Sequence, residues 1–388
     1  MLGQRTAQLG ALAAGHLCVD SYAVMIWPMV LFFADRHGLS VAQASLLPVL
    51  TAVMTSFAQP VMGYWSDRGL PRQIALAGPA IAAAGIALAI PATSITLLVL
   101  SLAISGLGVA VYHPEAAVLA GDLLPQRRSL ATGLFLFGGT LGLGLGPTLI
   151  PRANAFFGPR HSWLIAAPAI LATVALLTAF ARSKRRLDRL TRRVSLRDAF
   201  RGKGYSIALL VSINSLRGFS IAGVSMALTW LVKQRGGDEI RAGDLVSIFA
   251  LSGGLGGLLC GLVAVRRLEK PLLIGTMIAA PPLIWMLPYL SDPILMPLLA
   301  VGGMLTSATV PVVVAISQRM VPAGARVASS LMMGLSWGIG GMTAPPIVGQ
   351  IDRLEWAFVL AGLTMLPAAL CAVLLPRALR PDPTPPTP

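Results

Sequence analysis

The feature that most constrains this chain is a series of long apolar segments. Each runs for about 20 residues or more with few charges, the length that a helix needs to cross the hydrocarbon core of a bilayer. A backbone in lipid must satisfy its own hydrogen bonds, so such segments fold as α-helices. The predicted spans are 7–34, 41–65, 73–92, 95–121, 129–151, 162–182, 205–232, 243–265, 271–290, 293–317, 327–350 and 356–376.

The composition agrees with lipid as the main solvent. Of 388 residues, 55% are hydrophobic and only 12% are charged, whereas soluble domains average about 25% charged residues. We therefore predict an all-α integral membrane protein with twelve transmembrane helices in two pseudo-symmetric six-helix bundles. Residues 1–34 read as a full span without a small-residue cleavage site, so no cleavable signal peptide is expected.

A basic segment separates the first six predicted spans from the last six. Residues 182–203 hold ten Lys and Arg against two Asp. The pattern predicts an N-terminal bundle over 1–181 and a cytoplasmic linker over 182–203. It also predicts a C-terminal bundle over 204–376 and a disordered, Pro-rich tail over 377–388.

The net charge of +15 invites a nucleic-acid partner, but the distribution of the charge argues against one. If both termini lie on one side, that side holds 22 of the 30 Lys and Arg, the other side holds 7, and Arg217 lies within a span. This asymmetry follows the positive-inside rule and places both termini in the cytoplasm. We expect a multi-pass protein of a bacterial inner membrane, surrounded by lipid and without a nucleic-acid partner.

The two halves align as internal copies. With an offset of 197, residues 105–125 meet residues 302–322, and Pro114 meets Pro311. With an offset of 198, residues 142–147 meet residues 340–345 with a shared glycine and a shared proline. Duplicated six-helix halves are typical of transporters that rock one half against the other around a midplane site.

The repeat helps to distinguish residues that the fold requires from residues that serve the function. His113 and Glu115 of the first half correspond to Val310 and Val312 of the second, although the proline between them occurs in both. A requirement of the fold would be expected twice. We therefore interpret His113 and Glu115 as functional.

Ionisable side chains at membrane depth each require a reason, because an acid there costs about 2.5–3.5 kcal/mol on insertion scales. His16 and Asp20 are spaced i, i+4, so their side chains share a helix face and can meet. An imidazole beside a carboxylate can hold or pass a proton. The alternative is a hydrogen-bonded pair that fixes this span to a neighbour.

His113 and Glu115 are spaced i, i+2 and do not share a face of a regular helix. Pro114 between them removes a backbone hydrogen bond. One of the two side chains is expected to line a cavity while the other contacts an adjacent helix. Asp20, Glu115, His16 and His113 are the predicted proton-coupling residues.

Arg217 lies at the level of Asp20 when the seventh span is overlaid on the first with the same offset. Its permanent charge leaves three interpretations open. The guanidinium is a counter-ion for Asp20 or Glu115, it binds an anionic group of the substrate, or it reaches an interface.

Four further residues are candidate substrate contacts, each with a plainer alternative. Tyr112 can instead be a core aromatic or a hydrogen-bond partner of Glu115. Gln59 can instead satisfy carbonyls freed by Pro60. Trp27 and Trp337 can instead belong to interfacial aromatic belts.

Several motifs resemble those of the major facilitator superfamily. The stretch "GYWSDRGLPR", residues 63–72, resembles the glycine and aspartate loop between the second and third spans of that family. Gly63, Asp67 and Arg68 match, and Arg72 stands near the later basic pair. The resemblance implies that Asp67 stabilises the outward-open state and that these residues form a conformational gate.

The fifth span contains "LGLGLGPTL", which resembles a motif of proton-coupled antiporters in the same superfamily. Gly142, Gly146 and Pro147 match and are expected to contribute to the gate. Small residues let helices approach, so ordinary helix packing also explains the glycines. The arginine usual in the fourth span of drug antiporters is absent, with Leu102 in its approximate place.

A narrower resemblance rests on "HLCVD" (16–20), "QPVMGYWSDR" (59–68) and "YHPEAA" (112–117). Together these stretches resemble the fosmidomycin-resistance-type branch, whose members are drug and small-molecule exporters. The resemblance implies exchange of the substrate for protons by a monomer.

We therefore predict a proton-coupled secondary transporter that exports a small molecule or drug by alternating access. Two alternatives remain, a proton-coupled importer of an organic anion and a non-transporting membrane sensor. An enzyme is not expected, because no nucleophile and base set is present. Neither a cofactor nor a metal is expected, and Cys18, Cys260 and Cys371 have no spacing that indicates a disulfide framework.

Overall fold

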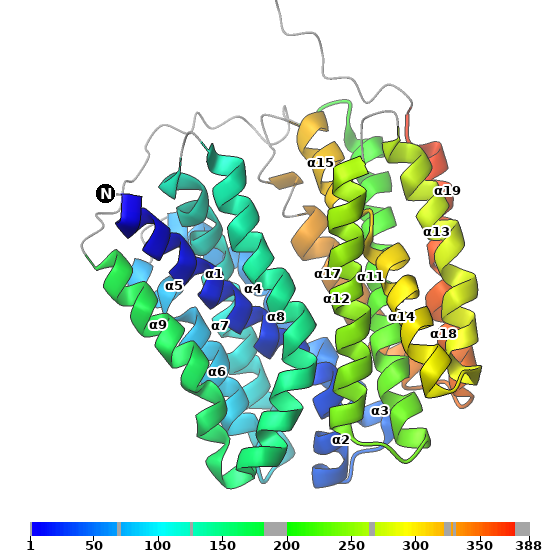
Figure 1. Ribbon diagram of the computed structural model, residues 1–388, viewed down its shortest axis with the longest axis horizontal. Coiled ribbons are helices and arrows are strands. Elements are labelled where there is room, and N and C mark those ends of the chain that lie inside the picture. The colour runs from blue at the N-terminus through cyan, green and yellow to red at the C-terminus, as the bar shows by residue number, and fades with distance from the viewer. Residues whose placement is uncertain are drawn as a thin grey trace, which may run out of the picture. The chain divides into compact units, whose positions relative to one another are not determined.

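In the computed structural model, the described part of the chain is helical, as the sequence predicts (Figure 1). The structure describes residues 2–67, 71–124, 127–181, 200–263, 268–321, 327–328 and 331–376. Arg68 lies outside these residues, as do most of the predicted linker and the whole predicted tail.

The structure describes ten helices before the predicted linker. They are α1 (Leu2–Val24), α2 (Ile26–His37), α3 (Val41–Ala44), α4 (Leu47–Asp67), α5 (Arg72–Leu76), α6 (Gly78–Ala89), α7 (Ile95–Leu123), α8 (Arg128–Phe157), the 3₁₀-helix η2 (Pro159–Ala166) and α9 (Ala167–Phe180).

The helices that the structure describes after the linker follow a similar order. They are α11 (Gly204–Gln234), α12 (Glu239–Val263), α13 (Glu269–Met286), the 3₁₀-helix η3 (Leu287–Tyr289), α14 (Asp292–Ser307), α15 (Val310–Met320), the π-helix η5 (Leu331–Leu335), α17 (Ser336–Val348), α18 (Leu354–Leu363) and α19 (Met365–Leu374).

The predicted count of twelve membrane spans is not confirmed within the described residues. Within the described residues, nine helices are long and apolar enough to cross a bilayer, or ten if α1 and α2, which are bent by 43°, form one span. The predicted span 73–92 is divided into α5 and α6, and the predicted span 327–350 contains η5 and α17. The count of twelve therefore stays a prediction.

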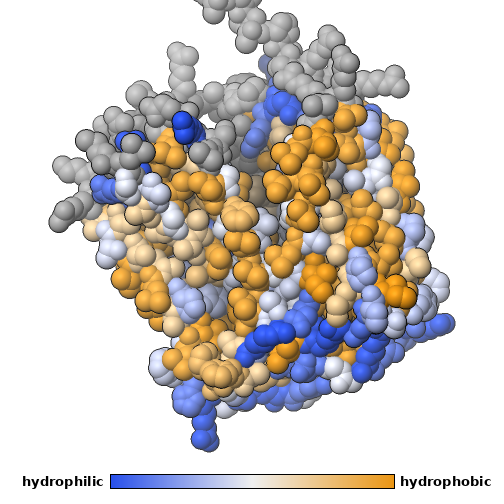
Figure 2. Space-filling model, in the orientation of Figure 1, coloured by the Kyte–Doolittle hydropathy of each residue, from blue (hydrophilic) through white to orange (hydrophobic). Residues whose placement is uncertain are grey.

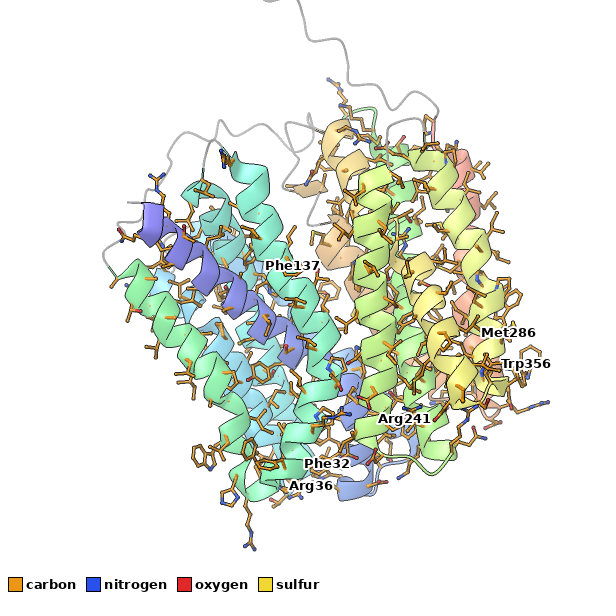
Figure 3. The ribbon with its side chains drawn as sticks, in the orientation of Figure 1. Phe32, Arg36, Phe137, Arg241, Met286 and Trp356 are labelled. Carbon is orange, nitrogen blue, oxygen red and sulfur yellow. The ribbon has the colours of Figure 1, made fainter. Side chains whose placement is uncertain are left out.

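The surface of the helices is apolar along their lengths. Figure 2 shows mostly hydrophobic residues on the sides of the helices and hydrophilic residues gathered near their ends. Phe137, Met286 and Trp356, labelled in Figure 3, have 59%, 50% and 58% of their surface exposed. Large exposed apolar side chains in such numbers indicate contact with a membrane.

Local sequence signals account for the turn after the first span. α2 ends at Gly38, whose φ of 62° is the left-handed conformation that glycine adopts readily at a helix C-terminus. Ser40 then starts α3 with a capping box, in which its side chain accepts from the Gln43 backbone N–H and the Gln43 side chain accepts from the Ser40 N–H.

The chain divides into two compact units. The first contains Met1–Arg185, Ser225–Leu251 and Gly341–Leu354, and the second contains Arg186–Val224, Ser252–Gly340 and Glu355–Pro388. In the first unit, α1 packs along α8 and also contacts α7 and α9. The predicted bundles over 1–181 and 204–376 stay predictions.

Candidate functional site

A row of glycines on α8 brings this helix against the backbone of α1. A side chain at Gly138, Gly142 or Gly146 would overlap the carbonyl oxygen of Ala13, Leu17 or Ser21 in turn. Both rows advance by four residues, so one face of α8 follows one face of α1. Contacts of this kind let membrane helices approach closely, and they fix the position of the side chains that α1 carries on this side.

The ionisable residues His16, Asp20 and His113 meet beside this glycine row. We call these three residues the proton cluster. One carboxylate oxygen of Asp20 lies 3.2 Å from His16 Nε2, and the other lies 3.2 Å from His113 Nε2. The side chains of Asp20 and His113 keep 13% and 21% of their surface exposed. The carboxylate therefore lies between two imidazoles, one from its own helix and one from α7.

Backbone carbonyls determine which nitrogen of each imidazole faces Asp20. His16 Nδ1 lies 2.8 Å from the carbonyl oxygen of Phe135, and His113 Nδ1 lies 2.8 Å from that of Val109. A carbonyl oxygen only accepts, so each Nδ1 must carry a hydrogen and donate it. In a neutral ring of this tautomer, Nε2 presents a lone pair to the carboxylate.

The two contacts of Asp20 therefore require two protons. Each short contact between Nε2 and a carboxylate oxygen is attractive only when a proton lies between the two atoms, on either of them. With both protons the cluster has a net charge of +1, with one it is neutral, and with none it is −1. Loss of the proton between His113 and Asp20 leaves two lone pairs facing each other and loosens a contact between α1 and α7.

The same donor atoms lie within 4.8 Å of one another, a spacing that can also accept a metal ion. Each facing pair already stands at hydrogen-bond distance, which a proton alone satisfies. The geometry therefore supports proton binding without any further group.

Two supporting residues of this cluster were absent from the sequence prediction. The Phe135 ring stacks on His16 with a centroid separation of 4.1 Å, and Phe135 also supplies the carbonyl that orients it. A side chain at Gly139 would come within 2.5 Å of the His16 ring and 2.7 Å of Asp20 Oδ2. The glycine-rich run before Gly142 was a usable signal for Gly139, whereas nothing in the sequence pattern pointed to Phe135.

Glu115 lies apart from the proton cluster, although the sequence grouped it with Asp20. It is 9% exposed, accepts a 2.6 Å hydrogen bond from Ser66 and forms an ion pair with Arg72, whose Nε lies 3.2 Å from its Oε1. His113 and Glu115 point to different helices because two residues cover about 200° of an α-helix. Glu115 thus connects α7 to the end of α4 and the start of α5.

This ion pair lies where the predicted gate loop joins its two helices. Arg72 belonged to that predicted gate, whereas its partner Glu115 did not. Gly63 packs opposite Pro114, and a side-chain carbon added at Gly63 would lie 3.6 Å from Pro114 Cβ. Asp67 ends α4, and its side chain lies outside the described structure.

Arg217 is almost completely buried, with 1% of its surface exposed. It donates to Asn214 Oδ1 at 2.9 Å and to Thr309 Oγ1 at 2.7 Å. Among the described residues it forms no ion pair, and Asp20 and Glu115 have the other partners given above. This burial does not fit snorkelling to an interface, and the other two interpretations of Arg217 stay predictions.

The other predicted substrate contacts occupy varied positions. Tyr112 is completely buried and donates a 2.6 Å hydrogen bond to the Leu12 carbonyl, so it connects α7 to α1. Gln59, Trp27 and Trp337 are half-buried. Pro147 lies inside α8, and its carbonyl closely approaches Gly243 of α12.

Ion pairs join α2 and α8 to α11 and α12 of the second half. Lys233 donates to Asp35 at 2.6 Å. Arg152 donates to both carboxylate oxygens of Asp244, at 2.7 and 2.9 Å. All four residues belong to the first compact unit.

Comparisons with known proteins agree with this architecture. A family profile described as the Major Facilitator Superfamily matches residues 12–216 and 208–388. The chain is 25% identical over 376 residues to the fosmidomycin resistance protein of Escherichia coli (strain K12), covering 95% of this chain and 92% of that protein. It is also 25% identical over 382 residues to monocarboxylate transporter 13 of Rattus norvegicus, covering 92% and 84%.

The fold is similar to that of a bacterial homologue of the human lysosomal transporter Spinster, solved in an inward-facing and occupied conformation. The TM-score is 0.72, over 96% of this chain and 95% of that one. The two sequences are 17% identical, so this likeness concerns the fold alone. With the family profile extending over nearly the whole sequence, the chain belongs to the major facilitator superfamily and is a multi-pass membrane transporter rather than an enzyme.

Proposed function

We propose that this chain is a proton-coupled secondary transporter that exports a small molecule by alternating access. The proton cluster of His16, Asp20 and His113 is the observation that carries the proposal. It combines a carboxylate and two imidazoles at membrane depth with contacts that depend on two protons. Residues of this kind inside a membrane mark proton relays in pumps and transporters.

The cluster provides a physical link between protonation and helix movement. When both protons are bound, Asp20 holds α7 through His113 and the contact between α1 and α7 is attractive. When the proton between His113 and Asp20 is lost, these facing atoms become repulsive, so the packing of His113 against α1 weakens. Proton binding therefore favours one arrangement of these helices over the other, as coupling requires.

Glu115 and Arg72 take a different role in this proposal. Their ion pair, supported by Ser66, joins α7 to the junction of α4 and α5 and acts as a conformational latch. Asp67 and Arg68 extend the same gate, and the glycine row on α8, with Gly142 and Gly146, provides the surface on which α1 moves.

Export rather than import is the proposed direction, and the support is the similarity to a protein named for fosmidomycin resistance. The excess of Lys and Arg on the side of the linker supports cytoplasmic termini in a bacterial inner membrane. A monomer is the expected functional unit.

Everted membrane vesicles from a pump-deficient host test this function. The vesicles are energised to an acid interior, and a panel of compounds that begins with fosmidomycin is added. We expect at least one transported compound to release protons from vesicles with the wild-type protein. Asp20→Asn removes the titrating carboxylate and is expected to abolish this release.

Two further variants control for the loss of a carboxylate itself. Asp352→Asn removes an exposed carboxylate outside the cluster and outside the ion pairs described above, and it should keep proton release. Glu115→Gln should change the rate but keep the dependence on the substrate, because it alters the latch. Normal proton release by Asp20→Asn would refute the assignment.

A further inference from the structure

Arg217 differs from the other buried charged side chains of the described structure. Glu115 pairs with Arg72, and Glu269 pairs with Arg319 at 2.6 Å. Arg217 is more deeply buried than either glutamate, yet within the described chain its hydrogen-bond partners are two neutral side chains. A buried charge without a countercharge is unfavourable. A bound anion would therefore stabilise the buried guanidinium of Arg217.

The guanidinium also keeps unused hydrogen-bonding capacity. It has five N–H donors, and its Nε has no protein partner in the described structure. Ser220, three residues further along α11 and 0% exposed, has a hydroxyl that is likewise unpartnered there. Arg217 and Ser220 are spaced i, i+3 on α11, so these two unpartnered donors lie on the same side of the helix.

The helices around Arg217 are interrupted at this level. Thr309 lies in the break between α14 and α15, and its hydroxyl accepts from Arg217 rather than capping α15. Asn214 donates a 2.5 Å hydrogen bond to the carbonyl of Met332 in the π-helix η5. Interrupted helices form the substrate sites of many transporters, and π-helical turns occur often at functional sites.

The internal repeat relates Arg217 to the proton cluster of the first half. Arg217 is the counterpart of Asp20 in the first half, and Thr309 is the counterpart of Tyr112, beside His113. The first half thus places an acid between two imidazoles where the second half places a cation whose partners in the described chain are neutral. The same position of the fold is thus occupied by Asp20, the proposed proton-binding residue, in one half. In the other half it is occupied by Arg217, which has no countercharge within the described chain.

We infer that Arg217, Asn214 and Thr309 form an anion site, which binds the carboxylate or phosphonate group of the transported solute. Arg217 supplies the charge, and its planar guanidinium suits the two oxygens of such a group. Asn214 and Thr309 hold the guanidinium in place. This inference rests on the proposed transport function and adds the substrate class.

Thermal unfolding of the purified full chain in detergent tests the site without a proton gradient. The probes are benzoate and methylphosphonate, compared with benzamide and chloride at constant ionic strength. We expect benzoate or methylphosphonate to raise the unfolding temperature of the wild-type protein in a saturable manner, with benzamide and chloride inactive. Arg217→Met should weaken this response by at least about tenfold, because charge-assisted hydrogen bonds are lost.

The stability of the variants without any probe separates binding from a structural role. Arg217→Met should fold and unfold at an equal or higher temperature than wild type, because it removes an uncompensated buried charge. Arg319→Met is the matched control in the same unit. It should lower the unfolding temperature, since it leaves Glu269 without its partner, and it should keep the response to the organic anion.

Three results would overturn the inference. One is an undiminished response of Arg217→Met to the organic anions. Another is an equal response of the wild type to benzamide, and the third is an equal response to chloride, which would indicate a small inorganic counter-ion instead. Because these measurements involve no proton movement, the anion site can fail while proton coupling through Asp20 holds, and the reverse also applies.

Discussion

At the scale of single residues, the chemistry depends on which atom of each side chain carries a hydrogen. His16 and His113 each bond a backbone carbonyl through Nδ1 and turn Nε2 toward Asp20. The cluster therefore needs two protons for both contacts of Asp20 to be attractive, one proton for each contact. Neither histidine alone would give the carboxylate two proton-dependent contacts.

His113→Gln tests this count. The glutamine amide can donate permanently to Asp20, so one contact no longer depends on a proton. We expect the logarithm of the transport rate to vary with pH at about half the wild-type slope, because one of the two protons is gone. His161→Gln, an exposed histidine on η2, should keep the wild-type slope. An unaltered slope in His113→Gln would contradict the count of two.

The sequence predicts part of this site and misses the rest for a physical reason. His16 and Asp20 could be paired because i, i+4 spacing on a helix fixes their proximity. The contact of His113 with Asp20 depends on the rotation of α7 against α1, which no local pattern encodes. The same holds for Glu115, whose partners Ser66 and Arg72 lie across a helix junction.

At the scale of helices, the glycine row on α8 determines how closely α1 approaches. The sequence indicated close packing from Gly142 and Gly146, but the register shows that Gly139 faces the proton cluster itself. The breaks at α5 and α6 and at η5 were also absent from the sequence prediction, because apolar periodicity continues through them. A hydropathy pattern indicates which segments lie in lipid. It does not indicate where the backbone hydrogen bonds of a helix are interrupted.

Gly139→Ala is expected to disturb the proton cluster by placing a methyl group of α8 against it. The added carbon would overlap His16 and approach Asp20, so we expect a loss of about 1–3 kcal/mol of stability, typical of overpacking. Proton-coupled transport should fall with it. The variant is measured by thermal unfolding and by transport in vesicles.

Gly133→Ala is the matched control on the same helix, because an added carbon there meets nothing within 4 Å. It should raise stability by about 0.5–1 kcal/mol, since alanine is the better helix former. Equal effects of the two substitutions would show that the α1 and α8 contact tolerates a side chain at Gly139.

The two halves use opposite charges at one structural position. Arg72 at the start of α5 pairs with Glu115 of α7, and Glu269 at the start of α13 pairs with Arg319 of α15. Residues 72 and 269 are related by the repeat offset of 197. In each half an ion pair begins from this position at the start of a helix, although the sign of its charge is reversed.

A double-mutant cycle with Arg72→Gln and Glu115→Gln measures the strength of the first pair. Both side chains are largely buried, with 12% and 11% exposed, so we expect a coupling energy of about 1.5–3 kcal/mol from unfolding measurements. A coupling energy near zero would show that Glu115 is held by other contacts and that the proposed latch is absent.

At the scale of the whole molecule, two ion pairs of the first compact unit bear on the proposed alternating access. Arg152 and Asp244 form a bidentate pair within the first compact unit, and Lys233 and Asp35 form a second pair there. A transporter that opens at the end where these pairs lie must break both of them. The pairs are partly exposed, so each contributes modestly to the balance between the two states.

Asp244→Asn should therefore favour the state that is open at this end. An exposed ion pair contributes about 0.2–1 kcal/mol, which corresponds to a shift of up to about fivefold in the ratio of the states. Spin labels on α8 and α12 at this end would report the change as a larger population of long distances. Asp352→Asn removes an exposed charge that lies outside both ion pairs and should leave the distances as in the wild type.

The most direct test of the central claim compares two transport modes of Asp20→Asn in proteoliposomes. The account predicts that substrate counterflow persists, because binding and helix movement remain, whereas accumulation driven by a pH gradient is lost. Accumulation driven by the gradient at the wild-type level would show that the protons move elsewhere in the molecule and would contradict the account.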